Sequence, residues 1–300
     1  MKSSKTEQLE PVEQPEKKKK PHKRKKGSTV KRIVGFKRKY LAIPYFVFLL
    51  LFVLIPIVII LVYAFTGTND AGELYFSFEC FVNFFSSPTK VNVLIVSLFV
   101  GILNTLLCLL IGYPIAYLLA DRRVNKNYVM VVLFIMPMWI NFVLRTGATR
   151  DLLLAMGLKG GEHPYVATMI GLVYNYLPFT ILPLYTTMIK LDKAQIEASK
   201  DLGCNKLKTF TKAILPQSVP GIVSAAEMVL MPTMSSYVIS DTLSEGKLTL
   251  FGNSIANSFY NNMWNDGSFM AFIMLVIIFI TMALTNKFGK GEEERKVGLW

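Results

Sequence analysis

The sequence has few of the residues from which catalytic and metal sites are built. Its 300 residues include only three cysteines and two histidines, and the histidines, His22 and His163, lie far apart in the sequence. No cysteine pair has metal-site spacing, and the phosphate-binding pattern GxxxxGKS or GxxxxGKT does not occur. We therefore expect no metal site, no nucleotide site of that type, no bound cofactor and no catalytic residue in this chain.

Charge is nearly missing from six long stretches, in a chain that is 52% hydrophobic with a mean hydropathy of +0.42. This composition excludes a single soluble core with a polar surface. About 20 apolar residues in a helix cross the roughly 30 Å of a bilayer's hydrocarbon, and the helix satisfies its own backbone. The sequence thus predicts an all-α membrane protein with six transmembrane helices, at 41–65, 93–120, 128–144, 165–189, 219–240 and 269–285.

Lysine and arginine are distributed unevenly between the connections. With the N-terminus in the cytoplasm, 28 of the 33 basic residues fall on the cytoplasmic side, and five fall outside. Because basic loops stay in the cytoplasm, both termini are expected there. The first 40 residues hold 15 of these cations and few large apolar residues, which predicts a disordered tail that lies on anionic lipid and does not bind nucleic acid.

These features divide the chain into five parts. Residues 1–40 form the basic cytoplasmic tail, residues 41–65 the first transmembrane helix, and residues 66–92 an extracytoplasmic loop. Five further helices follow in 93–286, with a long polar cytoplasmic loop at 190–218, and residues 287–300 form a short cytoplasmic tail. The long leader favours an uncleaved anchor over a cleaved signal peptide for the first helix.

The polar loop between the fourth and fifth helices is the most organised connection. Asp192 is suited to cap a short helix that Gly203 would end in a left-handed conformation. A second short helix from Asn205 to about Ile214 should end before Pro216, since proline disfavours helix at the preceding residue. From composition alone, this segment could also lie in the lipid interface.

The order of residues in this loop resembles the EAA loop of ABC importer permeases. Ser199 stands where that family has a second alanine, and Ala213 stands where it has isoleucine. The resemblance implies that this loop docks in a groove of the partner ATPase. The matching residues are Glu197, Ala198, Ser199, Gly203, Leu215 and Pro216.

Three further segments, 172–193, 201–210 and 237–243, are similar to permeases of spermidine/putrescine importers. The likeness spans about 41–285 and implies a type I importer permease in the bacterial plasma membrane. Its partners would be a second permease, a dimer of ATPase subunits that bind ATP and Mg²⁺, and an extracytoplasmic binding protein. Other cargoes, namely amino acids, thiamine, iron or anions, remain open, as does a scaffold that transports nothing.

Candidates for a cationic pathway are few. Glu227 is the acidic residue within the predicted helices, and Asp241 lies just past the fifth. Carboxylates and aromatic faces both attract ammonium groups. The alternatives are a packing contact with the second permease for Glu227, and lipid or packing contacts for the aromatic candidates, Trp139, Tyr174, Tyr176, Phe179 and Tyr237.

Overall fold

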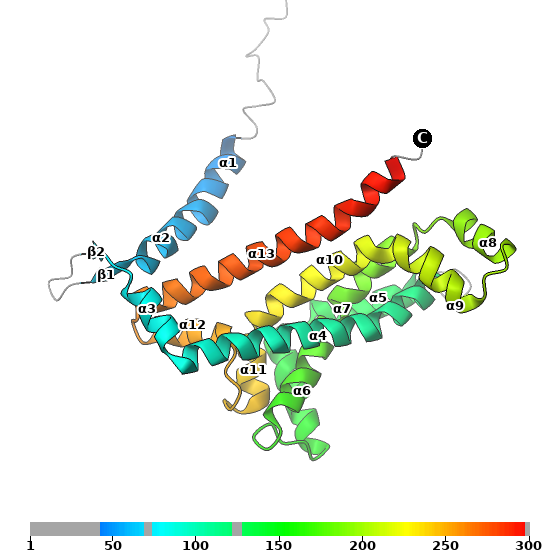
Figure 1. Ribbon diagram of the computed structural model, residues 1–300. Coiled ribbons are helices and arrows are strands. Elements are labelled where there is room, and N and C mark those ends of the chain that lie inside the picture. The colour runs from blue at the N-terminus through cyan, green and yellow to red at the C-terminus, as the bar shows by residue number, and fades with distance from the viewer. Residues whose placement is uncertain (1–42, 69–73, 122–127, 298–300) are drawn as a thin grey trace, which may run out of the picture. The chain divides into compact units, whose positions relative to one another are not determined.

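The computed structural model describes residues 43–68, 74–121 and 128–297 (Figure 1). The predicted basic tail and its contact with lipid therefore fall outside the described residues. The chain forms two units, Met1–Leu49 and Leu50–Trp300. In the first unit, the described residues form helix α1 (Ile43–Leu49).

The second unit is almost entirely helical within its described residues, with one hairpin of two short antiparallel strands in which Thr66 pairs with Phe76. Its elements in chain order are η2 (Leu50–Leu54), α2 (Ile55–Ala64), β1 (Thr66–Thr68), β2 (Leu74–Phe76), α3 (Glu79–Ser86), α4 (Pro88–Ala120), α5 (Val129–Ile135), η3 (Met136–Trp139), α6 (Phe142–Ala155), α7 (Pro164–Met188), α8 (Lys193–Asp201), α9 (Lys206–Thr209), η4 (Phe210–Ile214), α10 (Leu215–Met234), α11 (Tyr237–Ser244), α12 (Phe251–Tyr260) and α13 (Trp264–Val297).

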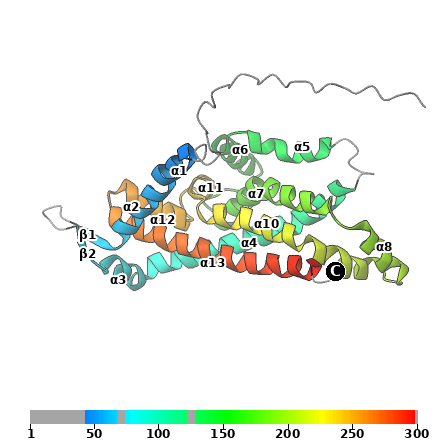
Figure 2. The same cartoon turned by 90° about the horizontal axis from the view of Figure 1, so that it is seen from above.

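Helices α4, α7 and α10 pack against one another at the centre of this unit (Figure 2). Polar side chains join them in the interior. The Asn104 amide donates to the Thr233 hydroxyl at 2.8 Å, and the hydroxyls of Tyr113 and Ser218 lie 2.9 Å apart. In a membrane such groups need partners within the protein, so these bonds fix which helix faces meet.

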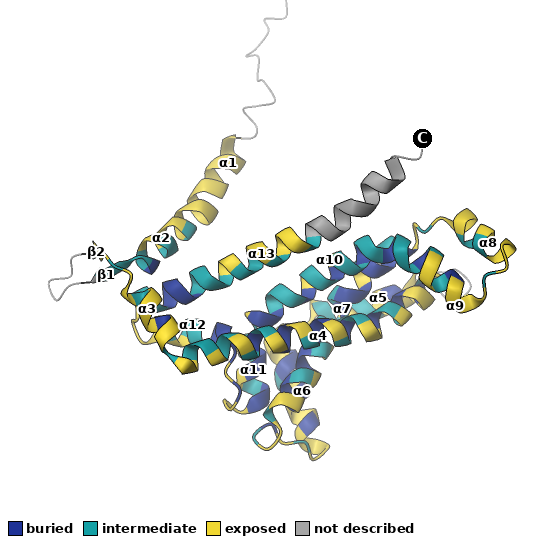
Figure 3. Ribbon diagram, viewed as in Figure 1, coloured by how far each residue is buried: buried dark blue, intermediate teal, exposed yellow. Residues whose placement is uncertain are grey.

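The outward faces of these helices are apolar. Along α4, Leu106 and Leu110 are exposed, whereas Asn104 and Cys108 on the opposite face are buried. Figure 3 shows exposed segments along this helix next to buried and intermediate ones. A helix that exposes leucine and buries its polar residues suits a lipid environment, where the hydrocarbon covers the apolar face. This pattern agrees with the expected membrane protein.

Among the described residues, five helical stretches are long and apolar enough to cross a membrane. They are 43–64, α4, α7, 206–234 and 264–285. A sixth span exists if α5–η3 and α6 count as one, although these two parts are bent by 96°. Five of the six predicted spans are thus present as single stretches, and the third corresponds to the bent pair.

The break in the third span has a local cause. Ile140 is extended, with ψ at 139°, and the Asn141 side chain accepts a hydrogen bond from the Val143 N–H at 2.9 Å. An asparagine that caps a helix in this way starts a new helix with a new direction. The predicted single helix over 128–144 is therefore wrong, because Asn141 caps a new helix within the apolar run.

The predicted fifth helix, 219–240, was also too long. Helix α10 ends at Met234, and α11 starts at Tyr237. At the break, the Ser235 and Ser236 hydroxyls both donate to the Pro232 carbonyl, at 3.1 and 2.8 Å. These bonds satisfy a carbonyl at a helix end that lies among apolar helices.

Two other boundaries differ from the prediction. The helix that begins after Asn205 does not end before Pro216, because it continues through the π-helical η4 into α10. In that π-turn, the Leu215 N–H donates to the Phe210 carbonyl, five residues back, and Pro216, which has no N–H, follows it directly in α10. The last helix, α13, runs past the predicted end at Thr285 to Val297.

Candidate functional site

The loop that resembles the EAA motif forms a defined projection. Helix α8 starts at Lys193 because the Asp192 carboxylate accepts the Ala194 N–H at 2.9 Å. The backbone N–H of Asp192 in turn donates to the Gln217 side chain at 2.9 Å, which ties the start of α8 to α10. The predicted N-cap at Asp192 is confirmed.

Gly203 ends α8 with φ at +77°. The Gly203 N–H donates to the Lys200 carbonyl at 2.8 Å, and the Cys204 N–H donates to the Ser199 carbonyl at 3.1 Å. This pair of bonds is a Schellman motif, which requires the left-handed conformation that glycine adopts without strain. The predicted stop at Gly203 is confirmed.

The motif residues occupy both ends of this projection. Glu197 and Ala198 are exposed on α8, while Leu215 and Pro216 open α10. The Ser199 hydroxyl, on the inner side of α8, lies 3.3 Å from the Thr209 hydroxyl of α9.

Two leucines at the tip of this loop are strongly exposed. Leu202 is 85% exposed and Leu207 is 71% exposed, although both belong to a polar segment. Single exposed leucines are common on protein surfaces, so these two form a docking surface only if the loop binds a partner.

A second candidate site is a cavity of about 510 Å³ bounded by the two helix breaks. Four of the five predicted aromatic residues line it, Trp139 from η3, Tyr176 and Phe179 from α7, and Tyr237 from α11. The Tyr176 hydroxyl also contacts the Ser236 hydroxyl across the cavity wall. Among the described residues that line this cavity, no carboxylate occurs.

The charged residue in this cavity is Arg145, one of the five basic residues that the sequence predicts on the outer side. It is only 7% exposed, and its guanidinium donates from Nε to the Asn175 amide oxygen at 2.8 Å and from a terminal nitrogen to the Pro137 carbonyl at 2.7 Å. The guanidinium also lies 5.7 Å from the centre of the Tyr174 ring. Arg145 thus joins α6 to η3 across the bend and to α7.

The other predicted residues lie outside this cavity. Tyr174 lies beside Arg145 without lining the cavity, and Glu227 accepts a hydrogen bond from the Thr285 hydroxyl of α13. Asp241 lines two smaller pockets beside α11. The signal that could have found Arg145 was its place one residue after the predicted third span, where a cation is costly unless paired.

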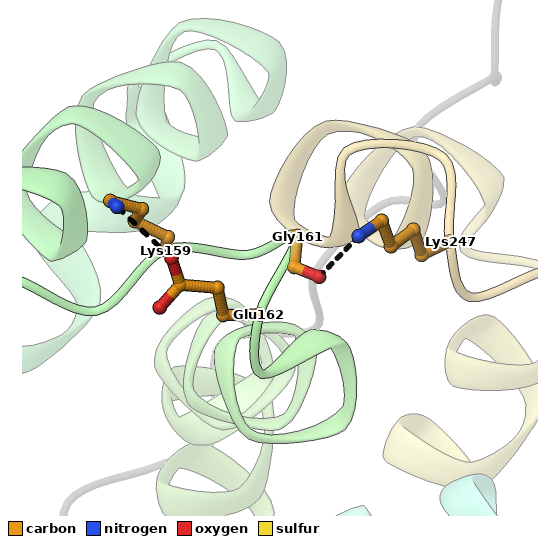
Figure 4. A network of polar contacts seen from close by, with 4 residues as sticks. All are labelled: Lys159, Gly161, Glu162 and Lys247. Atoms are coloured by element: carbon orange, nitrogen blue, oxygen red, sulfur yellow. Dashed lines mark hydrogen bonds and ion pairs between the residues drawn. The ribbon is translucent and has the colours of Figure 1, made fainter.

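Near the Pro164 end of α7, the connection between α6 and α7 packs on the turn after α11. Lys247 donates to the Gly161 carbonyl at 2.6 Å (Figure 4). Lys159 and Glu162 form an exposed ion pair at 3.0 Å, and this hydrogen bond lowers the pKa of Glu162. An exposed pair of this kind adds little stability, so the backbone packing holds the connection.

Gly160 is the tightest point of that packing, and we expect Gly160→Ala to destabilise the protein. An added Cβ would lie 1.9 Å from the Leu243 carbonyl oxygen, so α11 or the connection must move. Overpacking of this kind costs about 1–3 kcal/mol. Gly147→Ala is the control, because its Cβ would meet nothing within 4 Å inside helix α6. A midpoint of thermal unfolding in detergent that falls equally for both variants would contradict this reasoning.

Residues 32–291 match the family described as binding-protein-dependent transport system inner membrane component. The chain belongs to this family. The match includes both the α8–α9 projection and the cavity around Arg145. Membership makes the chain a membrane component of a transport system.

Two curated relatives are similar over most of their length. The spermidine/putrescine transport system permease protein PotB of Haemophilus influenzae is 33% identical over 257 residues, which cover 78% of this chain and 89% of the relative. PotB of Escherichia coli is 32% identical over 247 residues, which cover 77% and 90%.

A solved bacterial alginate ABC transporter, in complex with an alginate pentasaccharide-bound periplasmic protein, superposes with a TM-score of 0.62. The alignment covers 84% of this chain and 94% of that one at 14% identity, so it shows the fold alone. The predicted fold of an ABC transporter permease is confirmed.

Proposed function

We propose that this chain is a permease subunit of an ATP-driven importer for polyamines of the spermidine and putrescine type. The choice of polyamines as the cargo rests on the chain's 33% identity to a spermidine/putrescine permease, in an alignment that covers 89% of that protein. The permease acts with a second permease subunit, a dimer of ATPase subunits and an extracytoplasmic binding protein. ATP and Mg²⁺ bind to the ATPase subunits.

The α8–α9 projection is the contact with the ATPase in this proposal. Its exposed leucines, Leu202 and Leu207, supply apolar anchors for a groove, and Glu197 supplies a charge beside them. Movement of the ATPase reaches the membrane helices only through rigid joints. The Asp192–Gln217 bond and the unbroken run from α9 through η4 into α10 support that role.

The proposed orientation has both termini in the cytoplasm. The α8–α9 projection then faces the ATPase, and the Lys247–Gly161 contact and α11 face outward, toward the binding protein. The basic tail lies on the anionic lipid of the cytoplasmic leaflet.

The aromatic cavity is the proposed pathway within this subunit. Ring faces attract ammonium groups by about 0.5–2 kcal/mol each, without the strong retention that a buried carboxylate would cause. Arg145 lines the cavity and keeps its positive charge, but its two hydrogen bonds to neutral oxygens hold the guanidinium toward Pro137 and Asn175. We therefore assign Arg145 to the wall of the pathway.

Arg145 also favours a second candidate cargo. A buried cation in a cavity without a described carboxylate would suit a solute that carries a carboxylate, such as an amino acid. Uptake of labelled spermidine and putrescine into cells with and without this chain, its partners present, separates the two. Competition by unlabelled polyamines alone supports the first candidate. Competition by amino acids, or uptake that does not depend on this chain, contradicts it.

We expect deletion of residues 2–30 to leave uptake largely intact. This segment holds ten of the basic residues but none of the predicted spans, and a polybasic segment near a membrane contributes only about 1 kcal/mol per cation to lipid contact. Uptake is measured at equal protein level in the membrane. A collapse of uptake at unchanged level would contradict the proposal that the tail only contacts lipid.

A further inference from the structure

A smaller pocket of about 310 Å³ lies between α11 and α12, beside the aromatic cavity. We propose that it binds one ammonium group of the incoming polyamine before the cargo enters the aromatic cavity, and we call it the amine pocket. The residues that give it this chemistry are Tyr237, Asp241, Asn253, Asn257 and Tyr260. The proposal rests on the proposed function and names the entry site for the cargo.

Asp241 supplies the negative charge. It is exposed, and no described residue forms an ion pair with its carboxylate. Arg150 and Glu245 line the neighbouring pocket, which also includes Asp241, but neither lines the amine pocket. The carboxylate is thus available to a cation that enters between α11 and α12.

Two aromatic rings accompany that carboxylate. Tyr237 and Asp241 are four residues apart on α11 and so share one face of that helix. Tyr260, at the end of α12, is 78% exposed and lines the same pocket. A carboxylate with aromatic faces nearby is the combination that holds alkylammonium groups, and the Asn257 amide oxygen adds an acceptor.

Asn253, together with Ser240, also holds the pocket open. The Asn253 amide donates to the Tyr237 carbonyl at 3.3 Å and accepts the Leu250 N–H at 3.2 Å, so it joins α12 to α11. The Ser240 hydroxyl donates to the Leu248 carbonyl at 2.5 Å. This frame uses neither the Asp241 carboxylate nor the Tyr260 ring. Both can therefore be changed without loss of the frame.

Tyr237 links the amine pocket to the pathway, because it lines both the 310 Å³ pocket and the 510 Å³ cavity. A linear polyamine carries its charges along a flexible chain. One ammonium can stay at Asp241 while the rest of the molecule passes Tyr237 toward Trp139 and Tyr176. Because each ammonium group leaves one binding site only as it reaches the next, little free energy is spent on removing its water at each step.

The test uses the complete transporter, with its partner subunits and a saturating amount of spermidine-loaded binding protein. We expect Asp241→Asn to lower spermidine uptake about tenfold, because asparagine keeps an acceptor oxygen but lacks the negative charge that strengthens the hydrogen bond to an ammonium group. Glu245→Gln is the matched control, because it removes a neighbouring carboxylate that does not line the amine pocket. Its uptake should equal that of the unaltered transporter.

Tyr260 gives a second test that does not depend on Asp241. Tyr260→Phe keeps the ring and should keep uptake, while Tyr260→Ala should lower it about threefold, the size of one exposed cation–π contact. Full uptake by Asp241→Asn, or equal uptake by the two Tyr260 variants, would overturn the amine pocket. If the unaltered transporter takes up no spermidine, the proposed function fails instead. A variant with which the ATPase no longer co-purifies has lost assembly. If Asp241→Asn does so, the comparison of Tyr260→Phe with Tyr260→Ala decides whether the amine pocket exists.

Discussion

Gly203→Asp is expected to abolish uptake while the chain still reaches the membrane. Aspartate in the left-handed conformation at φ +77° costs about 1 kcal/mol, and without that conformation the two Schellman bonds cannot form. Helix α8 would then lose its fixed end. The added carboxylate would also place a negative charge directly after the exposed Leu202 in the proposed docking surface. Uptake and ATP hydrolysis by the assembled transporter measure the effect, and a loss of about 1–3 kcal/mol in coupling corresponds to a fall in uptake of about 5- to 150-fold.

Gly157→Asp is a closely matched control. Gly157 also has a positive φ, +83°, and like Gly203 it has nothing within 4 Å of an added Cβ. It follows helix α6, away from the α8–α9 projection. The two substitutions therefore impose the same backbone strain and add the same charge, so they differ in position alone. Equal uptake by both variants would contradict a coupling role for this loop.

Glu197→Lys should share this outcome for a different reason. Glu197 is exposed on α8, so its replacement leaves the interior of the protein unchanged. It reverses one charge on the proposed docking surface, and like charges that meet in an interface cost several kcal/mol. If this variant takes up the cargo and hydrolyses ATP normally, Glu197 is not part of the proposed contact with the ATPase.

The ends of α8 were predictable from the sequence because their signals are local. Asp192 caps through its own side chain, and Gly203 reverses the chain through its own φ angle. The apolar runs were predictable for a similar reason, because length and the absence of charge are read directly from consecutive residues. No knowledge of neighbouring helices was needed for either.

The aromatic cavity was not predictable in the same way. Its walls come from η3, α7 and α11, which meet only because two spans break, at Ile140 and at Ser235. Apolar composition continues through both breaks, so hydropathy alone gave single helices. Of the two acids put forward for the pathway, Glu227 contacts Thr285, and only Asp241 lies beside the cavity residue Tyr237.

Arg145→Lys should lower uptake about tenfold although it keeps the positive charge. The guanidinium binds two acceptors at once, the Pro137 carbonyl on one side of the 96° bend and Asn175 on α7. An ammonium group is a point charge on a flexible stem and does not reproduce this fixed fork. The loss of one hydrogen bond to a charged group costs about 1.5–3 kcal/mol. The midpoint of thermal unfolding should therefore fall together with uptake.

Arg150→Lys is the control for this substitution, since Arg150 lies on the same helix, α6, but is exposed. It should change neither uptake nor the unfolding midpoint. If Arg145→Lys behaved in the same way, the two-acceptor fork would not be needed at this position, and the role of Arg145 in holding the bend would be wrong.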